Sequence, residues 1–150
     1  MSDKEIFNEA VEFILRWEGF ISDDINDPGK LTVYGIASKW HPDEVAEMKR
    51  LIDEGKKDKA LEIAKDIYYN DYWLKADCDH YFFPANYLMF DTAVNMGISR
   101  ANDFFAISEN WQDYLLNRID YYKGLPTARY YLRGWVNRVT SLYRFIKERR

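Results

Sequence analysis

The stretch from Trp17 to Ile36, WEGFISDDINDPGKLTVYGI, carries the strongest structural signals in this chain. It opens at the end of an apolar-striped helical pattern, where Glu18 stands directly before Gly19, a residue that favours helix termination. Asn, Asp, Pro and Gly then gather at the centre of residues 21–36, which favours a loop or a short hairpin. The stretch therefore predicts a helix that ends in a glutamate and a turn-rich segment that folds back toward it.

The position of Glu18 favours a protonated carboxyl group. The negative end of the helix dipole opposes its ionisation, and the neighbouring rings of Trp17 and Phe20 can add desolvation. A carboxyl group that keeps its proton near neutral pH can donate it to the leaving oxygen of a glycosidic bond. Glu18 is therefore a candidate general acid, and the alternative is an ordinary solvent-exposed glutamate at a helix end.

Asp27 and Thr32 follow Glu18 at short intervals, and a hairpin of this length can bring both near it. A carboxylate and a hydroxyl that hold a water opposite an acid are the minimum set for hydrolysis with inversion. That reaction requires the two carboxyl groups to lie roughly 6.5–9.5 Å apart. Both residues also have a purely structural alternative, because Asp27 can cap backbone amides ahead of Pro28 and Thr32 can be an ordinary strand residue.

The stretch resembles the opening motif of the glycoside hydrolase family 108 muramidases, a lysozyme-like family that includes phage endolysins and secretion activators. In that family the motif runs Glu-Gly-Gly-Tyr, then Asp-Pro-Gly-Gly, then Thr and Gly-Ile. The positions that match without a gap are Glu18, Gly19, Asp27, Pro28, Gly29, Thr32, Gly35 and Ile36. The resemblance continues, in the family's order, in Tyr69–Trp73, Phe90–Ala101 and Gly134–Val139.

The chain also departs from the family pattern. Phe20 replaces the usual glycine two places after the acid, Lys30 replaces the second glycine of the loop, and Asp23-Asp24-Ile25 replaces the commoner Asn-Asp-Pro. These changes concern the shape of the loop and the sugar preference rather than the acid. After Ala101 the chain lacks the longer stretch of many relatives, so that residues 99–150 resemble a reduced peptidoglycan-binding half.

The resemblance implies a mainly α (α+β lysozyme-like) fold, a helical bundle with a small β-hairpin next to the active-site helix. It implies an N-acetylmuramidase that cleaves the β-1,4 bond between N-acetylmuramic acid and N-acetylglucosamine in peptidoglycan, as phage or prophage endolysins do. A lytic transglycosylase and a non-catalytic wall-binding or secretion-accessory protein are the two other functions that fit these motifs.

The resemblance also implies a set of site residues. Glu18 would be the general acid, and Asp27, helped by Thr32, would orient the attacking water or stabilise the oxocarbenium-like transition state. The expected substrate-binding residues are Tyr34, Tyr69, Tyr72, Asn95 and Trp135. Structural alternatives remain, because an asparagine at a helix end before a glycine is an ordinary C-terminal signal, and the aromatic residues can be core residues.

Length and composition agree with one globular domain. The chain has 150 residues, 47% of them hydrophobic, and no Pro/Gly/Ser-rich linker divides it. Ser2 and Glu5 form a capping-box pattern at the start of the first helix. Apolar periodicity, proline starts and glycine stops predict further helices over residues 42–54, 58–74, 84–96, 99–123 and 126–148.

Charge is unevenly distributed along the chain. Residues 101–150 hold 9 Lys and Arg against 5 Asp and Glu, whereas the net charge of the whole chain is −4. The last basic residues, Arg144, Lys147, Arg149 and Arg150, can attract anionic wall polymers or membrane surfaces, although cations also complement the dipole at a helix end. Nucleic-acid binding is not expected, because the chain is acidic and has no basic-aromatic motif.

No metal, cofactor or disulfide is expected. Cys78 is the single cysteine, and the run Asp77-Cys78-Asp79-His80 lacks the two separated ligand pairs of a structural zinc site. No apolar run has the length of a signal-peptide core or a membrane span. We therefore expect a monomer made in the cytoplasm that acts on glycan strands in the periplasm or cell wall, with a holin or another export route providing access.

Overall fold

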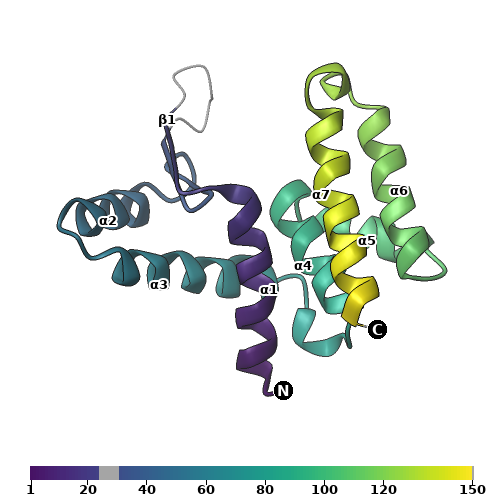
Figure 1. Ribbon diagram of the computed structural model, residues 1–150, viewed down its shortest axis with the longest axis horizontal. Helices are drawn as coiled ribbons and strands as arrows, with labels where there is room; N and C mark the ends of the chain where they lie inside the picture. The colour runs from purple at the N-terminus through teal and green to yellow at the C-terminus, as the bar shows by residue number, and fades with distance from the viewer. Residues whose placement is uncertain (24–30, 150) are drawn as a thin grey trace. The chain divides into compact units, whose positions relative to one another are not determined.

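The computed structural model describes residues 1–23 and 31–149. The chain divides into two compact units, Met1–Lys75 and Ala76–Arg150. Helices make up most of each unit (Figure 1), and the sheet found in the described residues is a small antiparallel one of three strands in the order β1-β2-β3. The predicted mainly α class with a small hairpin is confirmed, and the assignment of both units to one domain stays a prediction.

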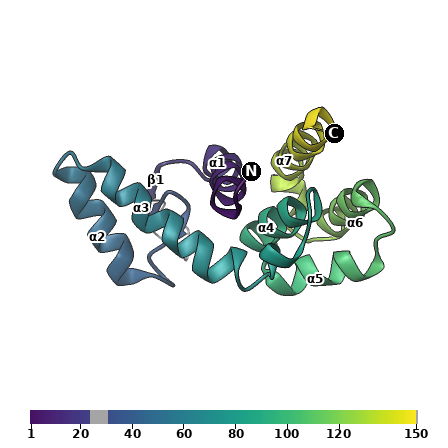
Figure 2. The ribbon, with the colours of Figure 1, turned by 90° about the horizontal axis from the view of Figure 1, so that it is seen from below.

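The first unit combines three α-helices with the sheet. Its elements are α1 (Asp3–Glu18), β1 (Ile21–Asp23), β2 (Leu31–Val33), β3 (Ile36–Ala37), α2 (Pro42–Asp53), α3 (Lys57–Tyr68) and a π-helical turn (Tyr69–Trp73). In the sheet, Ile21 pairs with Val33, and Val33 pairs in turn with Ile36. Helices α2 and α3 pack side by side (Figure 2).

Helix α1 begins and ends where its sequence predicts. The Ser2 side chain accepts a hydrogen bond from the backbone N–H of Glu5 at 3.2 Å, and the Glu5 carboxylate accepts one from the Ser2 N–H at 3.0 Å. This capping box satisfies two backbone donors that would otherwise lack a partner in the helix. Gly19 then takes a φ of 74°, which ends the helix directly after Glu18.

A shared apolar core joins the hairpin to the helices of the first unit. Val33 and Ile36 are 0% and 3% exposed, so one face of the hairpin is buried. The other fully buried members of this core include Val11, Ile14, Val45, Met48, Ala60, Ala64 and Tyr68. Burial of one large aliphatic side chain contributes about 1.5–3 kcal/mol, so the core fixes the hairpin's register as well as its position.

The second unit is helical. It consists of a 3₁₀ turn (Cys78–His80), α4 (Ala85–Met96), α5 (Ile98–Ile107), α6 (Trp111–Lys123) and α7 (Ala128–Arg149). Residues 86–93 of α4 are all buried, which makes α4 the central helix of this unit. Helices α6 and α7 pack against each other as a pair (Figure 1).

The prediction of a single helix over residues 99–123 is wrong, because the two helices α5 and α6 occupy this range. Ser108 has extended backbone angles, and its hydroxyl donates to the Phe104 carbonyl at 2.5 Å, which closes the end of α5. The Asn110 side chain accepts from the Asp113 N–H at 2.7 Å and caps the start of α6. The apolar pattern continues across the break, so periodicity alone did not reveal the two caps.

The described helices do not meet the requirements of a membrane-spanning helix. Within residues 1–23 and 31–149, none of them has both the length and the apolar character that a bilayer crossing needs.

Candidate functional site

Glu18 is the last residue of α1, and it is half-buried. Trp17 and Phe20, whose rings are expected to desolvate it, are each 38% exposed. A close neighbour of the Glu18 side chain comes instead from the turn between β2 and β3. That turn, Tyr34-Gly35, follows the buried Val33 and precedes Ile36.

Gly35 lies directly against Glu18. A Cβ atom added to Gly35 would stand 2.6 Å from the Glu18 Cβ and 2.9 Å from its Cγ, closer than real contacts of this kind. The same atom would stand 2.5 Å from the Tyr68 hydroxyl, and the φ of Gly35 is +81°. Only glycine satisfies both the close approach and the positive φ. The hairpin turn therefore packs on the Glu18 side chain because residue 35 has none.

Hydrogen bonds hold this turn in place. Tyr34 has a φ of 50°, and its N–H donates to the Phe20 carbonyl at 2.6 Å. Its own carbonyl accepts from the Tyr68 hydroxyl at 2.7 Å. The Tyr34 and Phe20 rings also contact each other, with centroids 5.0 Å apart. The turn is thus tied both to the chain just after Glu18 and to the buried end of α3.

The negative charge of Glu18 acts on the Tyr72 hydroxyl. Burial raises the pKa of the Tyr72 hydroxyl above its ordinary value, and the negative charges of Asp71 and Glu18 add to the shift. Its ring contacts that of Tyr68, with centroids 5.9 Å apart. The Tyr72 hydroxyl therefore stays neutral at physiological pH, able to donate a hydrogen bond near the candidate acid.

The structure brings two of the predicted binding residues, Tyr34 and Tyr72, into the surroundings of Glu18. Burial also raises the pKa of Tyr34, and the charge of Asp58 adds to this effect. Thr32 lies in the middle of β2, opposite Ser22 on one side and Ala37 on the other, and is half-buried. The predicted catalytic Asp27 lies outside the described residues.

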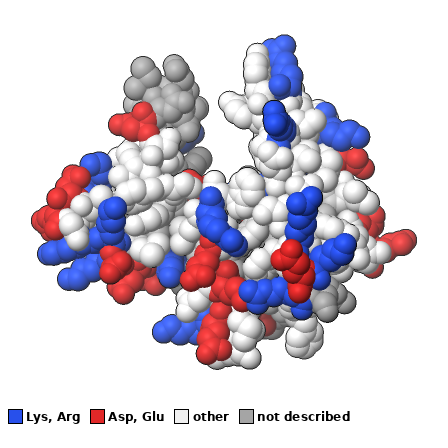
Figure 3. Space-filling view, in the orientation of Figure 1, with Lys and Arg blue, Asp and Glu red and all other residues white. Residues whose placement is uncertain are grey.

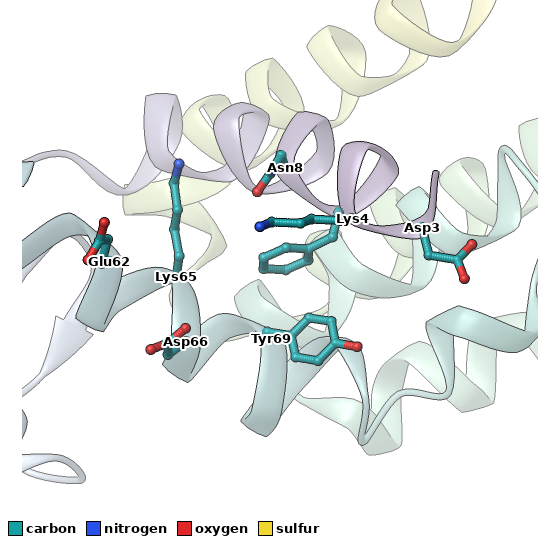
Figure 4. A pocket seen from close by; sticks show the side chains of 8 residues that line it. Asp3, Lys4, Asn8, Glu62, Lys65, Asp66 and Tyr69 are labelled. Carbon is teal, nitrogen blue, oxygen red and sulfur yellow. The ribbon is translucent and has the colours of Figure 1, made fainter. Parts of the chain in front are cut away.

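Tyr69 contacts a different part of α1. Its ring meets that of Phe7 edge-on, with centroids 5.0 Å apart. Both residues line a groove of about 720 Å³ between the first half of α1 and the last half of α3 (Figure 4). With a rise of about 1.5 Å per residue, Phe7 and Glu18 are about 16 Å apart along the helix. The structure therefore does not bring Tyr69 next to Glu18, and its binding role stays a prediction.

Asn95 and Trp135 belong to the second unit, where they meet through Tyr122. The Tyr122 hydroxyl donates to the Asn95 side-chain oxygen. The Trp135 ring stacks on the Tyr122 ring at 4.7 Å and 19°, and the centroid of the Tyr131 ring lies 5.7 Å from that of Trp135. Asn95 and Trp135 thus both have internal packing partners, which agrees with a structural role. Their contact with substrate stays a prediction.

A buried ionic cluster, which sequence reasoning missed, lies beneath these residues. Asp91, Arg118 and Arg138 are 2%, 0% and 5% exposed. Arg118 donates to one Asp91 oxygen at 2.6 Å, and Arg138 donates to the other at 2.9 and 3.1 Å. Arg118 also donates to the Tyr122 hydroxyl at 3.1 Å. The sequence signal that could have predicted this cluster is the presence of Asp91 and Arg118 at otherwise apolar helix positions.

The two arginines keep Asp91 ionised. Burial by itself disfavours the charged carboxylate, but attraction to Arg138 and Arg118, together with their hydrogen bonds, outweighs it and lowers the pKa of Asp91. A buried ion pair of this kind is costly to break, since removal of one partner leaves an uncompensated charge. The cluster therefore joins α4, α6 and α7 of the second unit.

Other chemistry has little support in the described part of the chain. Within residues 1–23 and 31–149, no group of three or more His, Cys, Asp and Glu side chains is arranged to hold a metal ion. Cys78 is buried, and burial raises the pKa of its thiol far above the ordinary value, so it is not a reactive thiolate. His80 contacts Asp77 within its own polar turn.

The arrangement around Glu18 suits proton donation. A half-buried carboxyl group stands at a helix end, packed against a glycine turn, and its charge acts on the neutral Tyr72 hydroxyl. Proton donation to a leaving oxygen requires such a positioned carboxyl group, and hydroxyl donors can orient a polar substrate such as a sugar.

A solved structure shares this fold. SagA from Brucella abortus superposes with a TM-score of 0.67 at 24% sequence identity, over 93% of this chain and 92% of that chain. At this identity the likeness concerns the fold alone, and it agrees with the predicted lysozyme-like class. Comparison with the curated proteins gave no match.

The family comparison covers the segment built around Glu18. The model of the glycosyl hydrolase 108 family matches residues 11–97, more than half of the chain. The matched range includes Glu18, the Tyr34-Gly35 turn, Tyr72 and Asp91. It supports a glycoside-hydrolase type of function with peptidoglycan as the substrate class. The resemblance seen in the motifs is thereby confirmed, and the chain belongs to the glycosyl hydrolase 108 family.

Proposed function

We propose that this protein is an N-acetylmuramidase that hydrolyses the β-1,4 bond between N-acetylmuramic acid and N-acetylglucosamine in peptidoglycan. The observation that carries the proposal is the packing of the Tyr34-Gly35 turn on the Glu18 side chain, inside the segment that matches the family. A glutamate held so closely by a backbone turn has a defined position, which a general acid needs and an ordinary surface glutamate lacks.

In the proposed mechanism, the Glu18 carboxyl group donates its proton to the leaving glycosidic oxygen. Asp27, with help from the Thr32 hydroxyl, orients the attacking water on the other face of the sugar, which gives inversion. Tyr34 and Tyr72 contribute neutral hydroxyl groups to substrate binding. General acid catalysis typically supplies about 10²–10⁴-fold, so binding and electrostatics must supply the remaining acceleration.

The experiment is mass spectrometry of the soluble fragments that the wild type, Glu18→Gln and Glu12→Gln release from purified peptidoglycan. Glu12 is an exposed residue of the same helix, so its replacement is a matched control for the loss of one carboxylate. We expect reducing-end muropeptides from the wild type and from Glu12→Gln, with a loss of about 10²–10⁴-fold in Glu18→Gln.

Other products would support other functions. Fragments ending in 1,6-anhydromuramyl groups would identify a lytic transglycosylase, in which a hydroxyl of the sugar replaces water as the nucleophile. Sedimentation with purified sacculi without release of any fragment by the wild type would indicate a wall-binding or secretion-accessory protein. Equal activity of the wild type and Glu18→Gln would exclude Glu18 as the acid.

We place this activity in the lysis of a bacterial host by a phage or prophage, with a separate holin opening the route to the wall. The support is the resemblance to a family that includes phage endolysins. Expression in a bacterial host should cause lysis only when a holin is co-expressed, and only with Glu18 intact. Lysis by the protein alone would show that it has its own route to the wall.

A further inference from the structure

The solvent-facing side of α7 carries a row of basic side chains. Arg129, Arg133, Arg144 and Lys147 are all exposed. Across residues 1–23 and 31–149, none of the four forms an ion pair with a described carboxylate. The guanidinium carbon of Arg129 lies 4.7 Å from the centroid of the neighbouring Tyr130 ring. The positive charge of this row is therefore available to a partner.

The four residues form one stripe, the α7 stripe. At about 100° per residue they fall within a sector of about 60° around the helix, and they extend over about 27 Å of its length. The opposite side of α7 is held in the core by Val139, Leu142 and Ile146, each at most 1% exposed. The stripe therefore faces solvent, and Figure 3 shows Lys and Arg side chains at intervals along this helix.

The charge of α7 contrasts with that of the remaining chain. Its range, Ala128–Arg149, holds six basic residues and a single acidic one, Glu148, for a net charge of +5. Because the whole chain has a net charge of −4, the other residues sum to −9. An extended anionic partner is therefore attracted to the α7 stripe, whereas the net charge of the remaining chain opposes its binding.

The spacing of the stripe favours a fluid anionic surface over a regular polymer. The successive steps along the stripe, from Arg129 to Arg133, on to Arg144 and on to Lys147, correspond to about 6, 16.5 and 4.5 Å along the axis, which matches no constant repeat. Mobile lipid headgroups can move to each cation, whereas the phosphates of a linear polyanion keep a fixed spacing. Next to the stripe, Tyr130 is 68% exposed and adds an aromatic side chain of the kind that is enriched at membrane interfaces.

We propose that the α7 stripe is a binding surface for membranes that contain anionic phospholipids. Binding is peripheral and electrostatic, because the apolar side of α7 already serves as core and cannot insert into a bilayer. Tyr130, at the start of the helix, contacts the headgroup region. The proposal does not depend on glycan hydrolysis, and membrane binding would hold a wall-active protein near the inner side of the wall.

The test is co-sedimentation of the full chain with phosphatidylcholine vesicles, with or without about 30% phosphatidylglycerol, an anionic lipid that gives the vesicle surface a negative potential. The test variant replaces Arg129, Arg133, Arg144 and Lys147 with Gln. The matched control replaces four exposed lysines outside α7 with Gln, and so has the same net charge: Lys39, Lys59, Lys75 and Lys123. Circular dichroism establishes that both variants are folded.

We expect the wild type and the control to bind only the anionic vesicles and to be released at high salt. One cation near such a surface contributes about fivefold, so the stripe variant should lose about two orders of magnitude or more in partition coefficient. Replacing Tyr130 with Ser should weaken binding several-fold without changing its salt dependence.

Three results would overturn the proposal. The wild type could fail to bind anionic vesicles, or the stripe and control variants could lose binding equally, which would reflect net charge alone. Binding to soluble polyphosphate that depends on the stripe, without binding to vesicles, would assign this surface to a linear polyanion instead of a membrane.

Discussion

Gly35 and Glu18 are in contact because residue 35 has no side chain: a Cβ there would lie 2.6 Å from the Cβ of Glu18. The contact links a turn of the hairpin to the last residue of α1. Since Tyr68 donates to the carbonyl of the residue before Gly35, the acid, the turn and α3 form one packed unit. A change in any of the three should therefore disturb the other two.

Gly35→Ala should abolish most activity. The new methyl group must displace either Glu18 or the turn, and a misplacement of about 1 Å can cost about 10²-fold in rate. Gly55→Ala is the matched control, because Gly55 also has a positive φ, +77°, but has nothing within 4 Å of an added Cβ. Peptidoglycan turbidity assays should show near-normal activity for the control. Equal losses in both variants would assign the effect to backbone strain.

Tyr68→Phe should lower thermal stability and activity together. Tyr68 is 1% exposed, and loss of its hydroxyl leaves the Tyr34 carbonyl without this donor. The expected cost is about 1–3 kcal/mol. Combined with Gly35→Ala, it should not restore activity, since the clash with Glu18 remains after the hydroxyl is gone. Restored turnover in the double variant would show that the clash with Tyr68, rather than with Glu18, causes the loss.

Tyr72→Phe should raise KM more than it lowers kcat. Burial and the charges of Asp71 and Glu18 raise the pKa of Tyr72, so its hydroxyl is neutral throughout the physiological range. The alkaline side of the rate profile below about pH 10 should therefore be the same in the wild type and the variant. Steady-state kinetics at several pH values measures this. A pH profile altered near neutrality would mean that Tyr72 changes the ionisation of the acid itself.

Asp91→Asn should destabilise the second unit by about 3–5 kcal/mol at pH 7, because two buried arginines lose their shared counter-ion. The native pKa of Asp91 is lowered, so its ionised form stabilises the fold above about pH 4, and that contribution is lost as pH falls through the native pKa. The difference between wild type and variant should therefore shrink in acid. Urea unfolding at pH 7 and at about pH 3 measures it, with exposed Asp120→Asn as the control.

Asn110→Ala should destabilise the start of α6. The Asn110 side chain caps the Asp113 N–H, and loss of such a cap costs about 1 kcal/mol. Gln112→Ala, an exposed change two residues later, should have almost no effect. Hydrogen exchange of the first turn of α6 gives a local measurement. Unchanged protection there would show that packing, rather than the cap, defines the break between α5 and α6.

Local signals in the sequence were enough to define α1 and its end at Glu18. The Ser2 capping box and Gly19 act on backbone groups a few residues away, so their effect does not depend on the surrounding fold. The turn-rich segment after Gly19 predicted the hairpin for the same reason. The family motifs identify Glu18 as the candidate acid from the sequence alone.

Only the tertiary structure decided which distant residues meet. Asp91 pairs with Arg118 and Arg138, 27 and 47 residues further along the chain. The contact of Gly35 with Glu18 likewise depends on the register of the hairpin and on the core beneath it. Such contacts arise from packing between helices and strands, and neither apolar periodicity nor capping residues encode which side chains face one another across that packing.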